Sequence, residues 1–145
     1  MNTKSEKSAE VFSKGFSCAQ AVLESHSGDF GLDSATSRKI AAAFGGGISH
    51  CGEVCGAVSG ALMLIGLKYG QFREGDSDSK ANTYNIAKSH MEKFKKEFGS
   101  INCTELVKYD LSKEEELLKA RESGVFKTLC PVLVKRSVEL VEEVL

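Results

Sequence analysis

The segment from Gly45 to Leu67 constrains the fold more than any other part of the chain. It starts with a triple glycine, passes through Cys51 and Cys55, and ends in the most apolar run, Ala61–Leu67. Apolar residues recur there at helical spacing and also occupy the other faces, which is typical of a helix buried among others. We therefore predict a central helix from about Glu53 to Tyr69.

Glycines at positions 52, 56 and 60 repeat every four residues within this segment. On a helix this spacing makes a bare stripe against which another backbone can pack closely. The stripe suits a contact inside the chain or a homodimer contact equally well, and both alternatives stay open.

The rest of the chain also predicts helices. No segment alternates with period two over a strand's length, and Pro131 is the only proline, which favours long helices. The 145 residues suit one domain with a real core. We expect a single all-α domain over residues 1–145, with five to seven helices packed around the glycine-rich one.

Two cysteines directly follow a helix-capping residue. Ser17-Cys18-Ala19-Gln20 has the capping-box pattern, and Asn102-Cys103-Thr104-Glu105 repeats the arrangement. Each cysteine is therefore predicted to be the first residue of a helix.

Two more cysteines lie near other predicted helix starts. Proline favours the first helical turn, so Cys130-Pro131 puts Cys130 at the N-cap or just before it. Cys55 lies within about one turn of the start of the central helix. Unpaired N–H groups and the macrodipole favour an anion at such ends, so we expect lowered thiol pKa values.

The site hypothesis is that these helix starts converge near the glycine-rich loop. The predicted redox thiols are Cys18, Cys55, Cys103 and Cys130, with Cys51 and His50 in accessory positions. The simpler alternative is that each cysteine is a small buried hydrophobe. His26 and His90 are interpreted as helix-surface residues.

Composition and charge exclude several classes. A formal net charge of -1 predicts no nucleic-acid partner, and the apolar run is too short for membrane insertion. The polar N-terminal segment lacks the pattern of a secretory signal, which predicts a cytoplasmic protein. Five cysteines fit poorly with a disulfide framework there, and no C-x-x-C occurs.

The motif Cys55-Gly56-Ala57-Val58-Ser59-Gly60, with Cys18 before it and Cys103 and Cys130 after it, resembles the C_GCAxxG_C_C family of small redox-active proteins. The resemblance runs from about residue 8 to 140. It implies a mostly helical cytoplasmic protein of bacterial or archaeal type, often encoded near transporters. The four family cysteines correspond to these four, and Cys51 lies outside the pattern.

Three functions follow as hypotheses. The leading one is a thiol redox protein that would act as an oxidoreductase, cycling between dithiol and disulfide with an unknown redox partner. The second is a metal-binding protein whose four cysteines hold an iron–sulfur cluster or Zn²⁺. A related helical module that accompanies cytochromes with an iron–sulfur centre points the same way. The third is a non-catalytic helical adaptor associated with a transporter.

Overall fold

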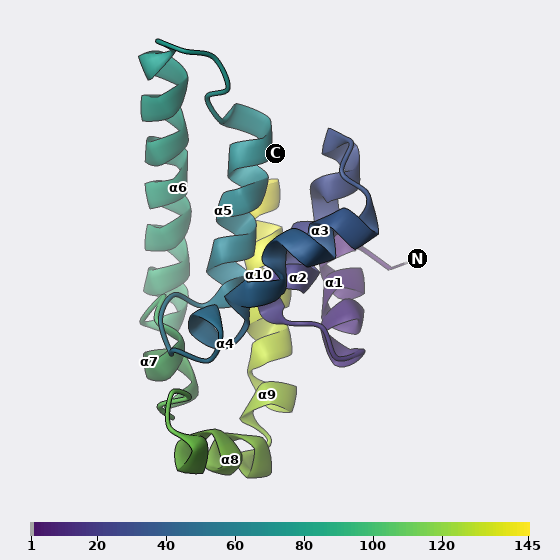
Figure 1. Cartoon of the computed structure of the whole chain (residues 1–145), viewed down its shortest axis with the longest axis vertical. Helices are drawn as coiled ribbons and strands as arrows, with labels where there is room; N and C mark the ends of the chain where they lie inside the picture. The colour runs from purple at the N-terminus through teal and green to yellow at the C-terminus, as the bar shows by residue number, and fades with distance from the viewer. Residues whose placement is uncertain (1) are drawn as a thin grey trace.

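The computed structural model describes residues 2–145, which form ten α-helices and two 3₁₀ turns (Figure 1). The helices of eight or more residues are α1 (Lys4–Ser13), α2 (Cys18–Ser27), α3 (Ser34–Ala41), α5 (Gly56–Tyr69), α6 (Ser77–Phe98), α8 (Glu114–Ser123) and α10 (Cys130–Glu142). The short elements are η1 (Gly28–Phe30), η2 (Ala42–Phe44), α4 (Gly45–Ile48), α7 (Cys103–Val107) and α9 (Val125–Thr128). The predicted all-α fold is confirmed.

Side-chain caps begin four of the longer helices. The caps are Thr3, Ser17, Asp33 and Asp76, and each accepts a hydrogen bond from the N–H three residues on. At α2, Ser17 Oγ accepts from the Gln20 N–H at 3.3 Å, and the Gln20 side chain accepts from the Ser17 N–H at 2.8 Å. This reciprocal pair confirms the capping box predicted before Cys18.

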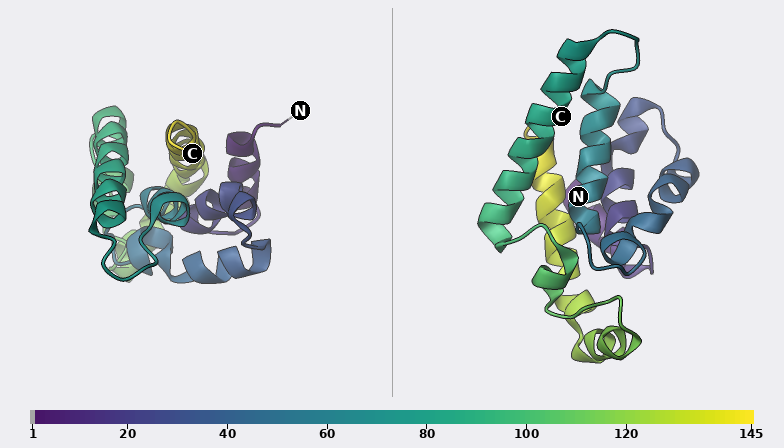
Figure 2. Two further views of the ribbon diagram at one scale, coloured as in Figure 1. Left: turned by 90° about the horizontal axis from the view of Figure 1, so that it is seen from above. Right: turned by 60° about the vertical axis from the view of Figure 1, so that its left-hand side comes forward.

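The helix α5 lies at the centre of the fold, in contact with α2, α6 and α10. Figure 2 shows α6 along one side of α5 and α10, with α1, α2 and α3 on the other side. On α5, Val58, Ala61 and Ile65 are completely buried. The prediction of a central helix buried among its neighbours is therefore confirmed.

Two glycines of α5 allow its close approach to α2. A Cβ on Gly56 would lie 2.8 Å from the Ala19 nitrogen, and one on Gly60 would lie 2.8 Å from the Ala19 oxygen. The stripe thus packs inside the chain, which answers the question that the sequence left open about these two positions. Gly52 lies before the helix, where it has a positive φ of 70°.

The central helix starts later than predicted, at Gly56 rather than Glu53. The preceding residues pair instead with the segment before α7, through an antiparallel bridge between Val54 and Asn102. Cys55 is consequently the N-cap of α5. Within residues 2–145 this bridge is the only pairing of the β type.

Both histidines predicted on helix surfaces are buried, so that prediction is wrong. His26 is 7% exposed and His90 is 4% exposed. His90 Nε2 lies 3.2 Å from Ser137 Oγ, and the Ser137 hydroxyl donates to the Ala57 oxygen at 2.7 Å. These bonds connect α6 through His90 to Ser137 of α10 and from there to α5, and burial lowers the pKa of His90 to about 4.

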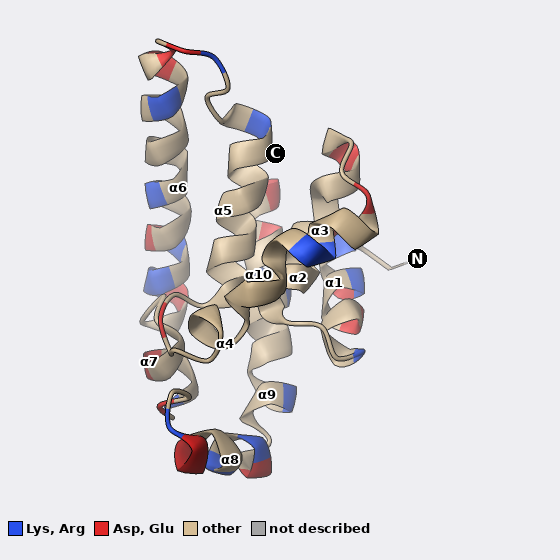
Figure 3. Ribbon diagram, viewed as in Figure 1, with Lys and Arg blue, Asp and Glu red and all other residues tan. Residues whose placement is uncertain are grey.

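Charged residues of both signs lie along α6 and α8 (Figure 3). Among the described helices, none combines the length and the apolar character needed to cross a membrane.

Candidate thiol site

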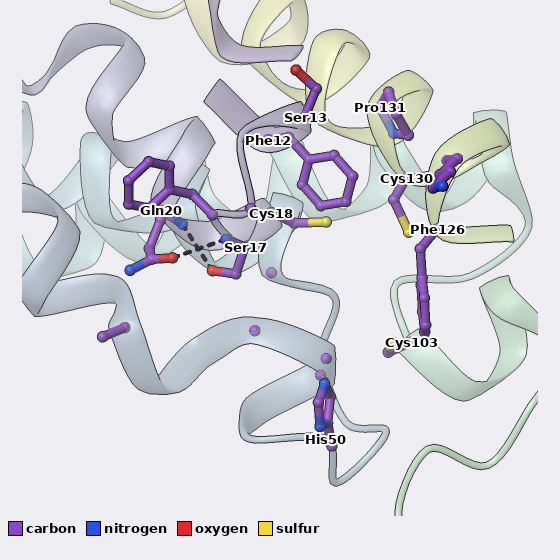
Figure 4. A pocket seen from close by; sticks show the side chains of 18 of the residues that line it. Phe12, Ser13, Ser17, Cys18, Gln20, His50, Cys103, Phe126, Cys130 and Pro131 are labelled. Atoms are coloured by element: carbon purple, nitrogen blue, oxygen red, sulfur yellow. Dashed lines mark hydrogen bonds between the residues drawn. The ribbon is translucent and has the colours of Figure 1, made fainter. Parts of the chain in front are cut away.

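A cavity of about 800 Å³ opens where the α1–α2 connection, the glycine-rich turn and helices α8 to α10 meet (Figure 4). Three predicted cysteines line it, namely Cys18, Cys103 and Cys130. Cys55 does not line the cavity and is 3% exposed. The four segments predicted to converge therefore do so, but they place only three of their thiols at the cavity wall.

Cys18 and Cys130 are the first residues of α2 and α10, and their side chains point toward each other (Figure 4). The interaction of the two side chains shifts their pKa values in opposite directions. We refer to these residues as the pocket pair. Cys18 is half-buried and Cys130 is 6% exposed.

Hydrogen bonding between the thiol of one cysteine and the thiolate of the other is the main cause of this separation. The Cys18 thiol donates to the Cys130 thiolate, which lowers the pKa of Cys130 against the opposing effect of burial. The same bond raises the pKa of Cys18 well above its ordinary value, with burial and the neighbouring thiols adding to it. One thiolate is thus favoured in the pair, and the second ionisation is opposed.

Cys55 and Cys103 directly follow the two residues of the antiparallel bridge, Val54 and Asn102, and we call these cysteines the bridge pair. The Cys55 N–H donates to the Ile101 oxygen at 2.8 Å, and the Cys103 N–H donates to the Glu53 oxygen at 2.7 Å. Since side chains alternate along such paired segments, both cysteines lie on the same face of the bridge.

Burial dominates the acidity of the bridge pair. It raises the pKa of Cys55 to about 11 and that of Cys103 to about 12. The lowered pKa values expected at helix starts are therefore found for Cys130 alone among the four. The physical reason is that moving a thiolate out of water costs more free energy than its interaction with the N–H groups of a helix start recovers.

Cys130 also differs from its predicted position. Leu129 has right-handed helical angles, and its N–H donates to the Val125 oxygen at 2.9 Å. The turn of α9 therefore runs almost directly into α10, and Cys130 is the first residue of α10 rather than its N-cap.

The triple glycine opens a left-handed turn of the backbone. Positive φ angles run without interruption from Gly46 to His50, at 65°, 68°, 68°, 51° and 62°. This left-handed turn forms one wall of the cavity and places His50 at its edge. A Cβ on Gly47 would lie 2.6 Å from Cys103 Cβ, so only glycine fits there.

The left-handed turn is strained at its non-glycine residues. Ile48, Ser49 and His50 each adopt a conformation that costs on the order of 1–3 kcal/mol. Backbone hydrogen bonds hold the turn, among them one from the Gly52 N–H to the Gly46 oxygen and one from the Glu53 N–H to the Gly47 oxygen. Cys51 follows the turn, is exposed and does not line the cavity.

The other residues that line the cavity were not predicted from the sequence. Phe12, Phe16 and Phe126 supply apolar surface, and Arg121 and Lys127 supply positive charge. Phe16 directly precedes the capping box before Cys18, and this position in the sequence would have allowed its place in the site to be predicted. Nothing in the pattern around Arg121 or Lys127 distinguishes them from other surface cations.

All five cysteines are free thiols. In the described part of the chain, no three His, Cys, Asp or Glu side chains are arranged to hold a metal ion. The metal hypothesis thus gains no support from this arrangement of the thiols, while a pair of adjacent thiols facing a cavity suits disulfide exchange.

A family model described as "Putative redox-active protein (C_GCAxxG_C_C)" matches residues 16–144, nearly the whole chain. The chain belongs to this family. The C_GCAxxG_C_C match includes the pocket pair and the bridge pair, although at Cys55-Gly56 the chain has cysteine before glycine. No curated protein and no solved structure matches the chain.

Proposed function

We propose that the protein carries out thiol–disulfide exchange through Cys18 and Cys130. The observation that carries this proposal is the pocket pair itself, two thiols from different helix starts that point toward each other at the wall of one cavity. Cys130 is the attacking thiol, because a thiolate is the reactive form and the Cys18 thiol stabilises it there.

The exchange consumes one external disulfide, RSSR. The Cys130 thiolate attacks one sulfur, a Cys130–S bond forms, the S–S bond of RSSR breaks, and RS⁻ leaves. That thiolate takes the proton of Cys18, and the Cys18 thiolate then attacks the Cys130 sulfur. A Cys18–Cys130 disulfide forms and the second RS⁻ leaves, so two protein thiols are oxidised and one disulfide is reduced.

The bridge pair takes no part in this exchange. Pocket access is open to Cys103 but not to Cys55, and burial keeps both thiols protonated near neutral pH. We propose that they remain reduced while the pocket pair exchanges.

Disulfide mapping tests the proposal. The Cys51→Ser variant, which lacks the exposed fifth thiol, is treated with one equivalent of an uncharged disulfide, digested without reductant and analysed by mass spectrometry. We expect a Cys18–Cys130 disulfide, and in the additional Cys18→Ser variant a mixed disulfide trapped on Cys130. Absence of both products would overturn the exchange mechanism.

The same preparation tests the rival hypotheses. Protein isolated anaerobically that is brown and contains stoichiometric iron, or colourless with about one zinc ion per chain, would favour a metal site held by the four cysteines. Metal-free protein whose thiols react no faster than unfolded cysteines would favour the adaptor hypothesis.

A further inference from the structure

We infer that the cavity takes a small anionic disulfide, a low-molecular-weight molecule that carries carboxylate groups beside its S–S bond. This inference rests on the proposed exchange and adds the class of substrate. It is carried by the size of the cavity, by its apolar walls and by two cations of its lining that form no ion pair with the residues that the structure describes.

The size and walls favour a small molecule over a protein disulfide. A volume of about 800 Å³ lies in the range that accommodates a compact organic ligand. The side chains of Phe12, Phe16, Phe126 and Pro131 enclose the cavity beside the thiols. A disulfide within a folded protein would have to project from its surface to reach Cys130, which is 6% exposed.

The charge of the lining favours an anion. Arg121 and Lys127 contribute to the wall, and no aspartate or glutamate among the described residues does so. Elsewhere, Arg38 lies 2.8 Å from Glu24 and Arg136 lies 2.8 Å from Glu97.

Arg121 and Lys127 form no such ion pair within residues 2–145. Their positive charge is thus available to a ligand, and both side chains are exposed enough to be reached from solvent.

Lys127 has a defined relation to the attacking thiol. Helical backbone angles continue from α9 through Leu129 into α10, so Lys127 and Cys130 are i and i+3 neighbours. Residues at this spacing share a helix face, with about 5–6 Å between their Cβ atoms. One small molecule can therefore place a carboxylate at Lys127 and a disulfide sulfur within reach of Cys130.

Two chromogenic disulfides test the inference. One is 5,5′-dithiobis(2-nitrobenzoate), which carries a carboxylate on each ring, and the other is 4,4′-dithiodipyridine, which is uncharged near neutral pH. Second-order rate constants are measured by stopped flow in the Cys51→Ser background. The Arg121→Gln/Lys127→Gln double variant is compared with Lys119→Gln/Lys135→Gln, which removes the same charge from exposed positions outside the cavity.

We expect Arg121→Gln/Lys127→Gln to slow the carboxylate reagent about tenfold relative to the uncharged one, because the cations attract the anion. The ratio of the two rates cancels any change in the thiolate population of Cys130. The control variant should change this ratio less than about twofold. Added salt should reduce the advantage of the anionic reagent in the Cys51→Ser parent and in the control variant, and should have little effect on the ratio in Arg121→Gln/Lys127→Gln.

An unchanged rate ratio, or an equal change in the control variant, overturns the inference about the substrate. The proposed function is judged separately, because the uncharged reagent must still yield the Cys18–Cys130 disulfide. Failure of that product with both reagents counts against the exchange, whereas its formation with an unchanged ratio counts only against the anionic substrate.

Discussion

The pocket pair and the bridge pair contain the same functional group at similar local positions, yet their chemistry differs. Cys18 and Cys130 line a cavity and shift each other's pKa values in opposite directions. The backbone N–H groups of Cys55 and Cys103 are held by pairing between two segments, and only Cys103 of these two lines the cavity. Both pairs sit at or beside helix starts. A helix start alone therefore does not lower the pKa of a thiol, because burial and a hydrogen-bonding partner decide the direction of the pKa shift.

The largest expected contrast is in alkylation. Near pH 8, the lowered pKa of Cys130 and the pKa values of about 11 and 12 at Cys55 and Cys103 predict rates that differ by roughly a hundredfold or more. Peptide mapping after timed iodoacetamide treatment measures each rate. Equal rates at Cys130 and Cys55 would remove the distinction between the pairs.

A second prediction concerns Gly56, where α5 and α2 hold the two pairs together. In Gly56→Ala the new methyl group would meet the Ala19 backbone at 2.8 Å and lie 3.2 Å from Cys18 Cβ. We expect the free energy of unfolding to fall by about 2 kcal/mol, a usual cost of overpacking. Denaturant unfolding measures it.

Gly66 offers the matched control in the same helix, because a Cβ there meets nothing within 4 Å. Gly66→Ala should leave stability unchanged or raise it by up to about 1 kcal/mol. If both variants behave alike, close packing at Gly56 is not what joins the pairs.

A third prediction uses the pH dependence of stability. The folded-state pKa values of Cys55 and Cys103 are raised above about 8.5, the ordinary value in an unfolded chain. The folded state then holds protons that the unfolded state has released. The stabilisation is complete below about pH 8.5 and is lost as the pH rises toward 11 and 12, at about 1.4 kcal/mol per pH unit for each group.

Urea unfolding at a series of pH values measures this slope. The Cys55→Ala/Cys103→Ala variant should show a slope shallower by about two protons, while other groups that titrate in this range contribute equally to both proteins. An identical slope would mean that burial does not set the acidity of the bridge pair.

The smallest effect is expected at Cys51, the thiol outside both pairs. It is exposed and does not line the cavity, so Cys51→Ser should change the free energy of unfolding by less than about 0.5 kcal/mol. The yield of the Cys18–Cys130 disulfide should be the same as in the unchanged protein. A reduced yield would make Cys51 a participant.

Local signals made much of the fold predictable. The capping box at Ser17 and the cap at Asn102 act within one turn of chain, so the helix starts at Cys18 and Cys103 followed from neighbouring residues. The burial of His90 was not predictable in this way, because it depends on Ser137 of another helix.

By itself the sequence determined an all-helical chain, a glycine stripe for close packing and cysteines at helix starts. These properties depend on contacts between residues only a few positions apart. Tertiary structure alone decided that Cys18 meets Cys130, that Cys55 stays outside the cavity, and that Arg121 and Lys127 lie at its edge. The reason is that burial and thiol–thiol distance are properties of segments far apart in the chain, which only packing brings together.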